Sequence, residues 1–211
     1  KCLQKLIDEG VIDTITCPLK SGKEADVFIV EREDACYIAK VFRERQIRSF
    51  KNDAGYREGR KSGNTRSQRA MDNNSRYGKE LAEAAWHKAE ANALTELFEA
   101  GVRVPELFDH FDQVLFMELI CDDDGEPAPQ LGNVKLTAEQ ALDTYETVLG
   151  EIIRMLLAGY IHADLSPYNV LLDDDGPVII DFPQCISAAH NLQAGKILER
   201  DIHSISQHLG L

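Results

Sequence analysis

The sequence predicts an α+β fold with two lobes, the first mostly β and the second mostly α-helical. Apolar runs typical of strands, together with one long helix, fill the first half of the chain. An acidic connector with proline and glycine follows at 121–133, and after it come a helix, a short hairpin and a last helix. A chain of 211 residues suits one domain of two small lobes. We therefore expect a single domain over 1–211, with a first lobe at 1–120 and a reduced second lobe at 121–211.

Each element of the first lobe is predicted from local spacing. Apolar residues at helical spacing predict a helix over 1–9 and a longer helix over 79–100. Each helix is followed directly by a glycine, which commonly ends a helix. Short apolar runs between turn residues predict strands at 26–30, 36–42, 102–110 and 113–120.

The second lobe has its own start and stop signals. Thr137 is the expected cap of a helix that runs through Ala158, with Glu139 and Gln140 in its first turn. A tight turn in the sequence DDDG predicts a pair of strands around it. The expected ranges after the helix are strands at 169–172 and 177–181 and a helical region near 191–209.

Charge is distributed unevenly along the chain. The formal net charge of −13 argues against a protein that mainly coats nucleic acid. Residues 43–79 nevertheless hold eleven Lys/Arg and four Asp/Glu, a net charge of +7, together with many Gly, Asn and Ser residues. Such a composition predicts a long, flexible, basic loop inserted in an acidic body. Contact with nucleic acid is a hypothesis for this loop alone.

The cysteines and the hydropathy indicate a cytoplasmic protein. The five cysteines are scattered and include no CxxC pair, so neither a disulfide framework nor a zinc site is expected. The chain has no apolar run of the roughly 18 residues that a membrane helix needs. We therefore expect a reducing cytoplasmic location and no membrane partner.

The clearest chemical pattern is at 160–181, YIHADLSPYNVLLDDDGPVIID. Asp164 is expected on a loop after a helix, where its carboxylate can orient a hydroxyl nucleophile or accept its proton. Asn169 begins the next strand, and the turn after that strand brings Asp181 back beside it. An amide oxygen and a carboxylate at adjacent strand ends are ligands that suit Mg²⁺ on a nucleotide phosphate. A solvated acidic hairpin is the alternative, but it does not explain three such residues between apolar runs.

Lys40 lies inside the apolar strand CYIAKVF, where an unpaired ammonium group would be costly to bury. A lysine in this setting can hold the α- and β-phosphates of a nucleotide when a helix carboxylate neutralises it. Glu90 interrupts the apolar stripe of the long helix and is the expected partner, with Glu83 as the second candidate. The alternatives are an edge-strand lysine and a solvated glutamate.

Two further segments are candidates for contacts with a nucleotide. The turn between the first strands offers phosphate a hydroxyl, a close backbone approach and a positive charge. Its residues are Ser21, Gly22 and Lys23, although a turn with one glycine is also typical of a plain hairpin. The apolar strand that runs into the connector is where a purine would meet the backbone, although a plain core strand would look the same. The residues expected there are Met117, Glu118 and Ile120.

These residues resemble the protein kinase-like superfamily, and specifically the RIO family of atypical kinases. The matching segments follow one another in the family's order over nearly the whole chain. They are SGKEADVF at 21–28, Met117-Glu118 before an acidic loop that contains PAP, IHADLSPYNVLL at 161–172 and IDFPQ at 180–184. The first RIO subfamily, or a bacterial relative of it, is the most similar.

The resemblance implies a kinase-like fold and a serine/threonine protein kinase that uses ATP with Mg²⁺, or with Mn²⁺ in its place. Asp164 would be the catalytic base, and Asn169 and Asp181 would bind the metal. Lys40 with Glu90 would position phosphates. The resemblance also implies that Ser21 and Lys23 belong to the phosphate-facing turn.

Four functions remain to be compared. The first two are a protein kinase and an ATPase switch that acts through an acyl-phosphate on Asp181 and releases a ribosomal or RNA-containing partner. A small-molecule phosphotransferase is disfavoured by SGKEA, by Tyr168 and by the short second lobe. An inactive binding module is disfavoured because the chain retains all four central residues, Lys40, Asp164, Asn169 and Asp181. The sequence leaves the first two open.

The chain departs from ordinary protein kinases after Asp181. Pro183 stands where those kinases have glycine, so a flip of this segment as an on–off switch is not expected. Thirty residues follow Asp181 and none of them spells Ala-Pro-Glu, so we expect neither the activation segment nor the peptide-binding helices. The protein substrate is unidentified, and the basic loop at 43–79 is the candidate for binding a protein, ribosomal or RNA partner.

Overall fold

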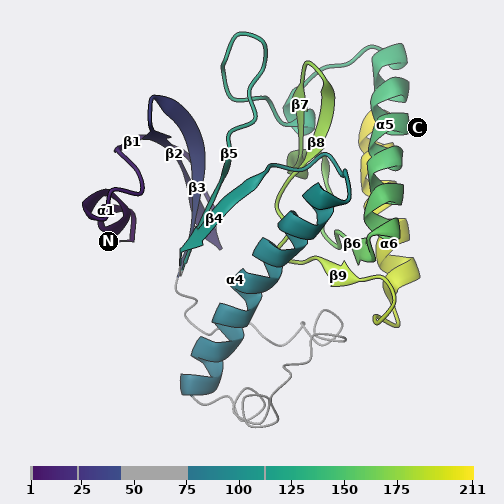
Figure 1. Cartoon of the computed structure of the whole chain (residues 1–211). Helices are drawn as coiled ribbons and strands as arrows, with labels where there is room; N and C mark the ends of the chain where they lie inside the picture. Colours follow the sequence, from purple (N-terminus) through teal and green to yellow (C-terminus); the bar gives the residue numbers. More distant parts are fainter. Residues whose placement is uncertain (1, 23, 44–75, 112) are drawn as a thin grey trace.

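The computed structural model describes residues 2–22, 24–43, 76–111 and 113–211, with the backbone alone for 76–87. These residues form the predicted two-lobed α+β architecture (Figure 1). Most of the predicted loop at 43–79 lies outside them, and its last residues are helical because the long helix begins at Arg76. No helix in the described part of the chain combines the length and apolar character needed to cross a membrane.

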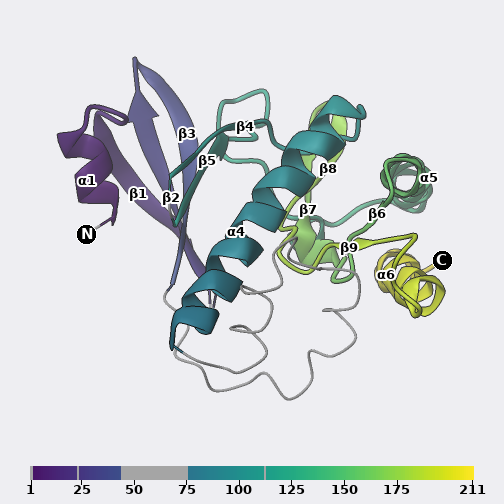
Figure 2. The same cartoon turned by 60° about the horizontal axis from the view of Figure 1, so that its bottom comes forward.

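The first lobe is built on a five-stranded antiparallel sheet in the order β1-β2-β3-β5-β4. Its strands are β1 (Thr14–Ser21), β2 (Ala25–Arg32), β3 (Ala35–Phe42), β4 (Leu107–Phe111) and β5 (Val114–Glu118). Helix α1 (Cys2–Asp8) lies beside the sheet on the side away from the second lobe. Helix α4 (Arg76–Glu99) runs between the sheet and the second lobe (Figures 1 and 2).

The two faces of the sheet carry different apolar clusters. Phe28 and Phe116 pack with Leu6 of α1 on what we call the outer face. Ile29 and Ile38 belong to the cluster shared with α4 and the second lobe, on the inner face. Because successive residues of a strand point to opposite faces, the position of a residue along its strand decides which lobe it can reach.

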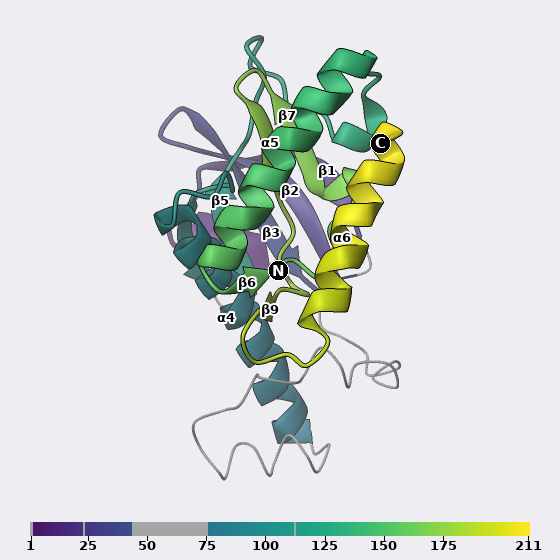
Figure 3. The ribbon, with the colours of Figure 1, turned by 90° about the vertical axis from the view of Figure 1, so that its right-hand side faces the viewer.

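The second lobe packs helix α5 (Ala138–Leu157) beside helix α6 (Ala194–Leu209), as Figure 3 shows. The shorter elements are η1 (Leu131–Asn133), β6 (Tyr160–Ile161), η2 (Pro167–Asn169), β7 (Val170–Asp173), β8 (Gly176–Ile179) and β9 (Ile186–Ser187). The predicted cap of α5 is confirmed. The Thr137 hydroxyl accepts a hydrogen bond from the backbone N–H of Gln140, and the Gln140 side chain accepts one from the backbone N–H of Thr137. The predicted strand pair is confirmed as β7 and β8.

The carboxyl end of α4 is bonded to the second lobe. The hydroxyl of Tyr160 donates to Glu96 at 2.6 Å. Just beyond the helix, the backbone N–H of Arg103 donates to Glu151 at 2.9 Å, and its guanidinium donates to Asp173 at 2.6 and 2.9 Å. These contacts fix α4 relative to β6, and its following segment relative to α5 and β7.

The connector at 121–133 is bonded to the hairpin of β7 and β8. The backbone N–H of Leu172 donates to the carbonyl of Pro129 at 2.9 Å. The side chain of Gln130 donates to the carbonyl of Tyr168 at 2.6 Å. The chain that leaves the first lobe is therefore held against the loop that carries the candidate chemistry.

Of the predicted strands, the one at 102–110 differs most from the structure in its limits. The strand predicted at 102–110 begins only at Leu107. Pro105 has no backbone N–H to donate, and the carbonyl of Arg103 accepts from Ile179 of the second lobe instead. The strand that the sequence implies before the turn at 21–23, without predicted limits, is β1.

Candidate active site

Lys40 joins two carboxylates between the lobes. Its Nζ lies 2.6 Å from Oε1 of Glu90 on α4 and 2.6 Å from Oδ1 of Asp181, just beyond β8. Lys40 is 9% exposed and Glu90 is 2% exposed. The structure therefore brings together the lysine and the glutamate that the sequence pairs, while the side chain of Glu83 lies outside the described residues.

Local geometry explains how both partners reach this point. Ala93, Leu94 and Leu97 are buried on α4 at the spacing that places them on the same stripe as Glu90. Lys40 lies two residues before the end of β3 and points to the inner face, where α4 packs. The buried stripe of α4 and the inner face of β3 therefore bring Glu90 and Lys40 together.

The three charges perturb one another. Burial alone would lower the pKa of Lys40, but the carboxylates of Glu90 and Asp181 outweigh burial and the pKa is raised. Burial raises the pKa of Glu90 by more than the charge of Lys40 lowers it. Burial alone would also raise the pKa of Asp181, but the charge and hydrogen bond of Lys40 outweigh burial and the pKa of that carboxyl is lowered. At neutral pH, Lys40 is therefore a cation and Asp181 an anion.

Asp164 lies on the loop between β6 and η2 with its side chain exposed. The buried ring of His162 supports this loop. Its Nε2 lies 3.0 Å from the carbonyl of Ile180, and its Nδ1 lies 3.3 Å from the backbone N–H of Asp164. These contacts need the neutral ring with its proton on Nε2. In agreement, burial lowers the pKa of His162.

Helix α6 holds the same loop from the other side. Oδ2 of Asp201 accepts a hydrogen bond from the backbone N–H of Ala163 at 2.7 Å, and Arg200 donates to the carbonyl of Ala163. Ala163 has φ +67°, a left-handed conformation that few residues other than glycine adopt. Both peptide groups beside the Ala163 Cα are therefore bound by one helix, which keeps the strained backbone in place.

Sequence reasoning missed Asp201 and Arg200. Acidic and basic residues of an amphipathic helix normally face water, yet Asp201 is 2% exposed. The spacing of apolar residues along α6 could have pointed to Asp201. Asp201 lies four residues from both Ile197 and Ile205, so it interrupts their buried stripe.

Asn169 and Asp181 lie at neighbouring strand ends. The side-chain N–H of Asn169 donates to the backbone carbonyl of Asp164 at 2.9 Å. The backbone carbonyl of Asn169 accepts a hydrogen bond from the backbone N–H of Ile180 at 3.0 Å. The side-chain oxygen of Asn169 and the second carboxylate oxygen of Asp181 remain as hard donors, which fit a divalent cation. Within the described ranges, no cluster of three or more His, Cys, Asp or Glu side chains could hold a metal. This mixed pair is therefore the donor set to consider.

Ser21 is not brought to the inner face with Lys40. Ser21 is paired with Asp26 across the turn, and its hydroxyl donates to that carboxylate at 2.7 Å. Arg43 donates to the Ser21 hydroxyl, also at 2.7 Å. Hydrogen bonds from Arg43 and Ser21 lower the pKa of Asp26. The hydroxyl that the sequence offers to phosphate is thus bound within the sheet.

The rest of the turn is described in part. The backbone N–H of Gly22 donates to the carbonyl of Ala25 at 2.9 Å. A Cβ atom on Gly22 would lie 3.1 Å from that oxygen, so the tight turn favours glycine. Lys23 lies outside the described residues.

The candidate base-binding residues lie where β5 meets the connector. Met117 is 8% exposed and belongs to the inner-face cluster, opposite Ile38 of β3. Glu118 is half-buried and closes the strand. The carbonyl of Ile120 accepts from Ala128 at 2.9 Å, so the connector folds back on itself directly after the strand.

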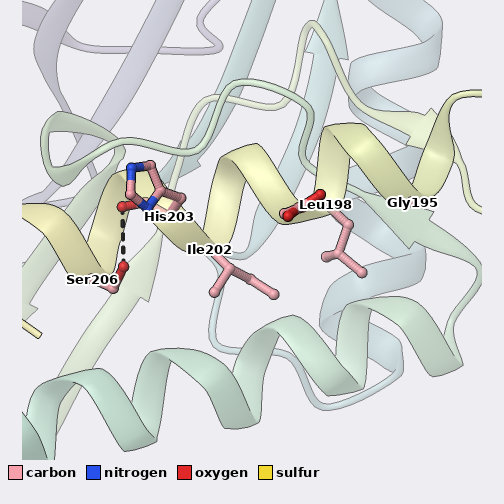
Figure 4. Close-up of a pocket in the computed structure, with 6 residues that line it drawn as sticks. Gly195, Leu198, Ile202, His203 and Ser206 are labelled. Carbon is pink, nitrogen blue, oxygen red and sulfur yellow. Dashed lines mark hydrogen bonds between the residues drawn. The ribbon is translucent and has the colours of Figure 1, made fainter.

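A hollow of about 360 Å³ lies along α6, away from Lys40 and Asp181. Figure 4 shows Leu198 and Ile202 pointing from α6 toward the neighbouring helix, while Ser206 donates to the backbone of His203. Its lining residues all belong to α6 and include Glu199 and His203 beside the two apolar side chains, and none of them is a residue of the candidate site.

A small antiparallel sheet joined to a helical lobe, with a Lys–Glu pair facing an aspartate of that second lobe, defines a protein kinase-like fold. The RIO domain family matches residues 26–210 of the chain. The chain therefore belongs to the RIO domain family.

Named relatives agree with this assignment. The chain is 32% identical to the RIO-type serine/threonine-protein kinase Rio1 of Haloferax volcanii, over 97% of this chain and 66% of the relative. It is 32% identical to serine/threonine-protein kinase rio2 of Schizosaccharomyces pombe, over 89% of this chain and 49% of the relative. The rio1 kinase of the same yeast is 30% identical, over 97% and 40%. The chain thus spans from two fifths to about two thirds of the length of these relatives.

Proposed function

We propose that the protein is an atypical serine/threonine kinase, which transfers the γ-phosphate of ATP to a serine or threonine hydroxyl of another protein. The observation that carries the proposal is the contact of one buried lysine with a carboxylate of each lobe, at 2.6 Å in both cases. An ammonium group held in this way is prepared to meet the negative charge of a nucleotide between the lobes.

In the proposed reaction, Lys40 binds the α- and β-phosphates, and Glu90 keeps the lysine charged and in place. Asp164 orients the acceptor hydroxyl, whose oxygen forms a bond to the γ-phosphorus. The bond to the β–γ bridging oxygen breaks, its electron pair leaves with ADP, and the hydroxyl proton passes to Asp164. The exposed side chain of Asp164 supports this role, because an acceptor protein must reach it.

Asn169 and Asp181 are the residues that we propose to hold Mg²⁺, or Mn²⁺ in its place. When bound, the metal offsets the charge of the phosphate oxygens. The lowered pKa of Asp181 favours the ionised ligand that this role requires. The turn at 21–23 would cover the phosphates without the Ser21 hydroxyl, which is bound to Asp26 and Arg43. Met117, Glu118 and Ile120 would contact the adenine.

The assignment of 1–211 to one kinase domain, with lobes at 1–120 and 121–211, belongs to the same proposal. So do a cytoplasmic location and a ribosomal or RNA partner. The partner prediction falls almost wholly on residues outside the described ranges, so the charge of 43–79 is its only support.

Radiolabelled ATP tests the proposal with the protein and a candidate protein substrate. We expect phosphoprotein in the presence of Mg²⁺, and none from Asp181→Asn or Lys40→Met. Phosphoprotein formed equally by wild type and both variants would contradict the assigned site. Circular dichroism of each variant checks that it is folded.

An ATPase that acts through Asp181 is the second candidate. The side chain of Asp181 is 42% exposed and ionised, so its carboxylate is available as a nucleophile. In this reaction an Asp181 oxygen bonds to the γ-phosphorus, ADP leaves, and water then hydrolyses the acyl-phosphate to free phosphate. A phosphoprotein sensitive to hydroxylamine, together with free phosphate and no labelled substrate, would favour the ATPase. Label stable to hydroxylamine on a serine or threonine would favour the kinase.

A further inference from the structure

A second lysine lies in the same cross-strand row as Lys40. Lys20 of β1 is paired with Val27 of β2, Val27 is paired with Lys40 of β3, and Lys40 is paired with Leu115 of β5. Directly opposed residues of antiparallel strands point to the same face. Lys20 and Lys40 therefore project from one face of the sheet, two strand spacings or about 10 Å apart.

The face in question is the inner one. Val27 packs against the cluster shared with α4 and the second lobe. The next pair along, Ser21 with Asp26, points to the opposite face, where both side chains bind Arg43. The same alternation that turns Ser21 away from the candidate site thus turns Lys20 toward it.

The same row shows which part of a bound nucleotide Lys20 would lie beside. The end of β3 next to the connector is marked by the pair of Tyr37 with Glu118, where the base is proposed to bind. Lys20 is in the row of Lys40, three residues further along the strand. Its position therefore corresponds to the phosphates and not to the base.

The ammonium group of Lys20 is open to solvent at the edge of the sheet. Lys20 is exposed, and among the described residues it has no ion pair within 4.0 Å. Its ammonium group is therefore available to an anion at the edge of the site.

The geometry points to Lys20 as a second cation of the triphosphate site, which binds the terminal phosphates of ATP from the sheet while Lys40 binds the inner ones. This inference rests on the proposed function, because it takes ATP as the ligand between the lobes. It adds a phosphate contact from β1 in place of the Ser21 hydroxyl.

Nucleotide binding by the folded protein tests the inference. Titration calorimetry gives the affinities of ATP and adenosine for wild type, Lys20→Met and Lys20→Arg, with Mg²⁺ present. We expect Lys20→Met to weaken ATP binding by about 10-fold, because a charge-assisted contact is lost. Adenosine binding should be unchanged, and Lys20→Arg should retain most of the ATP affinity. Lys196→Met, which removes an exposed lysine of α6, is the matched control and should change neither affinity.

The outcomes separate this inference from the function on which it rests. Equal ATP affinity of wild type and Lys20→Met would overturn the role of Lys20 and leave the kinase proposal intact. Equal losses for ATP and adenosine would also overturn it, because they indicate a damaged sheet. If the wild type binds neither ligand, the proposed function fails first.

Discussion

The Nζ of Lys40 lies 2.6 Å from Oδ1 of Asp181, although 141 residues separate them in the chain. Lys40 belongs to β3 of the first lobe, and Asp181 follows β8 of the second lobe. Neither lobe contains both charges, so this contact depends on the packing of the sheet and α4 against the second lobe.

Replacing Asp164 by asparagine should slow phosphoryl transfer by roughly 10²–10⁴-fold, since the carboxylate that takes the proton is lost. The affinity for ATP should stay within about twofold, because the side chain is proposed to meet the acceptor and not the nucleotide. Steady-state rates with labelled ATP and separate binding titrations measure the two effects. Asp175→Asn, an exposed acid in the turn after β7, is the control. A wild-type rate for Asp164→Asn would remove the assignment.

Replacing Glu90 by glutamine should lower the free energy of unfolding by about 3 kcal/mol, because a buried Lys40 loses one of its two counter-charges. Asp181 still pairs with the lysine, so the loss is expected at the low end of the range for broken buried pairs. Urea denaturation at neutral pH measures it. Glu99→Gln, at the exposed end of the same helix, should change stability little. Equal stability of Glu90→Gln and wild type would show that the pair contributes nothing net.

His162 should make stability depend on pH near neutrality. Its folded pKa is lowered by burial, so the unfolded chain takes up the proton first as the pH falls below about 6.5. The stability that comes from keeping His162 neutral is therefore present above that pH and is lost below it. The free energy of unfolding then falls by at most about 1.4 kcal/mol per pH unit. Unfolding free energies of wild type and His162→Gln should converge between pH 7.5 and 5.5. Parallel profiles would contradict this, and His203→Gln, at an exposed site, serves as control.

Asp201→Ala should reduce both stability and turnover. It leaves the buried N–H of Ala163 without its acceptor, which costs about 1–3 kcal/mol. Because the contact fixes the loop before Asp164, the turnover rate should fall while ATP affinity holds. Asp201→Asn keeps an acceptor oxygen and should restore most of the rate. Stability and rates measured beside Glu199→Ala, an exposed acid of α6, separate this effect from general damage to the helix. Unchanged kinetics in Asp201→Ala would show that α6 does not position the loop.

Local patterns predicted much of the fold and the central charges. The stripe of α4 pointed to Glu90 because a carboxylate among buried apolar residues needs a partner, and Lys40 posed the same problem on its strand. The cap at Thr137 was equally local. Contacts set by tertiary packing could not be predicted in this way. Asp201 meets Ala163 only when α6 packs against the loop, 38 residues away in sequence.

The orientation of Ser21 shows a second limit of sequence reasoning. A serine beside glycine in a turn suggests a phosphate contact, yet its direction depends on strand register. The pairing of β1 with β2 shifts between Pro18 and Lys20, and this irregularity decides which residue points to which face. A pattern of residue types does not record such a shift.

The bonds of Tyr160 with Glu96, and of Arg103 with Glu151, have a mechanical consequence. They tie the carboxyl end of α4 to the second lobe, while Leu94 and Leu97 of the same helix pack in one cluster with Ile29 of the sheet. A movement of one lobe against the other therefore has to break either these hydrogen bonds or this apolar packing, and the helix that carries Glu90 is anchored to both lobes.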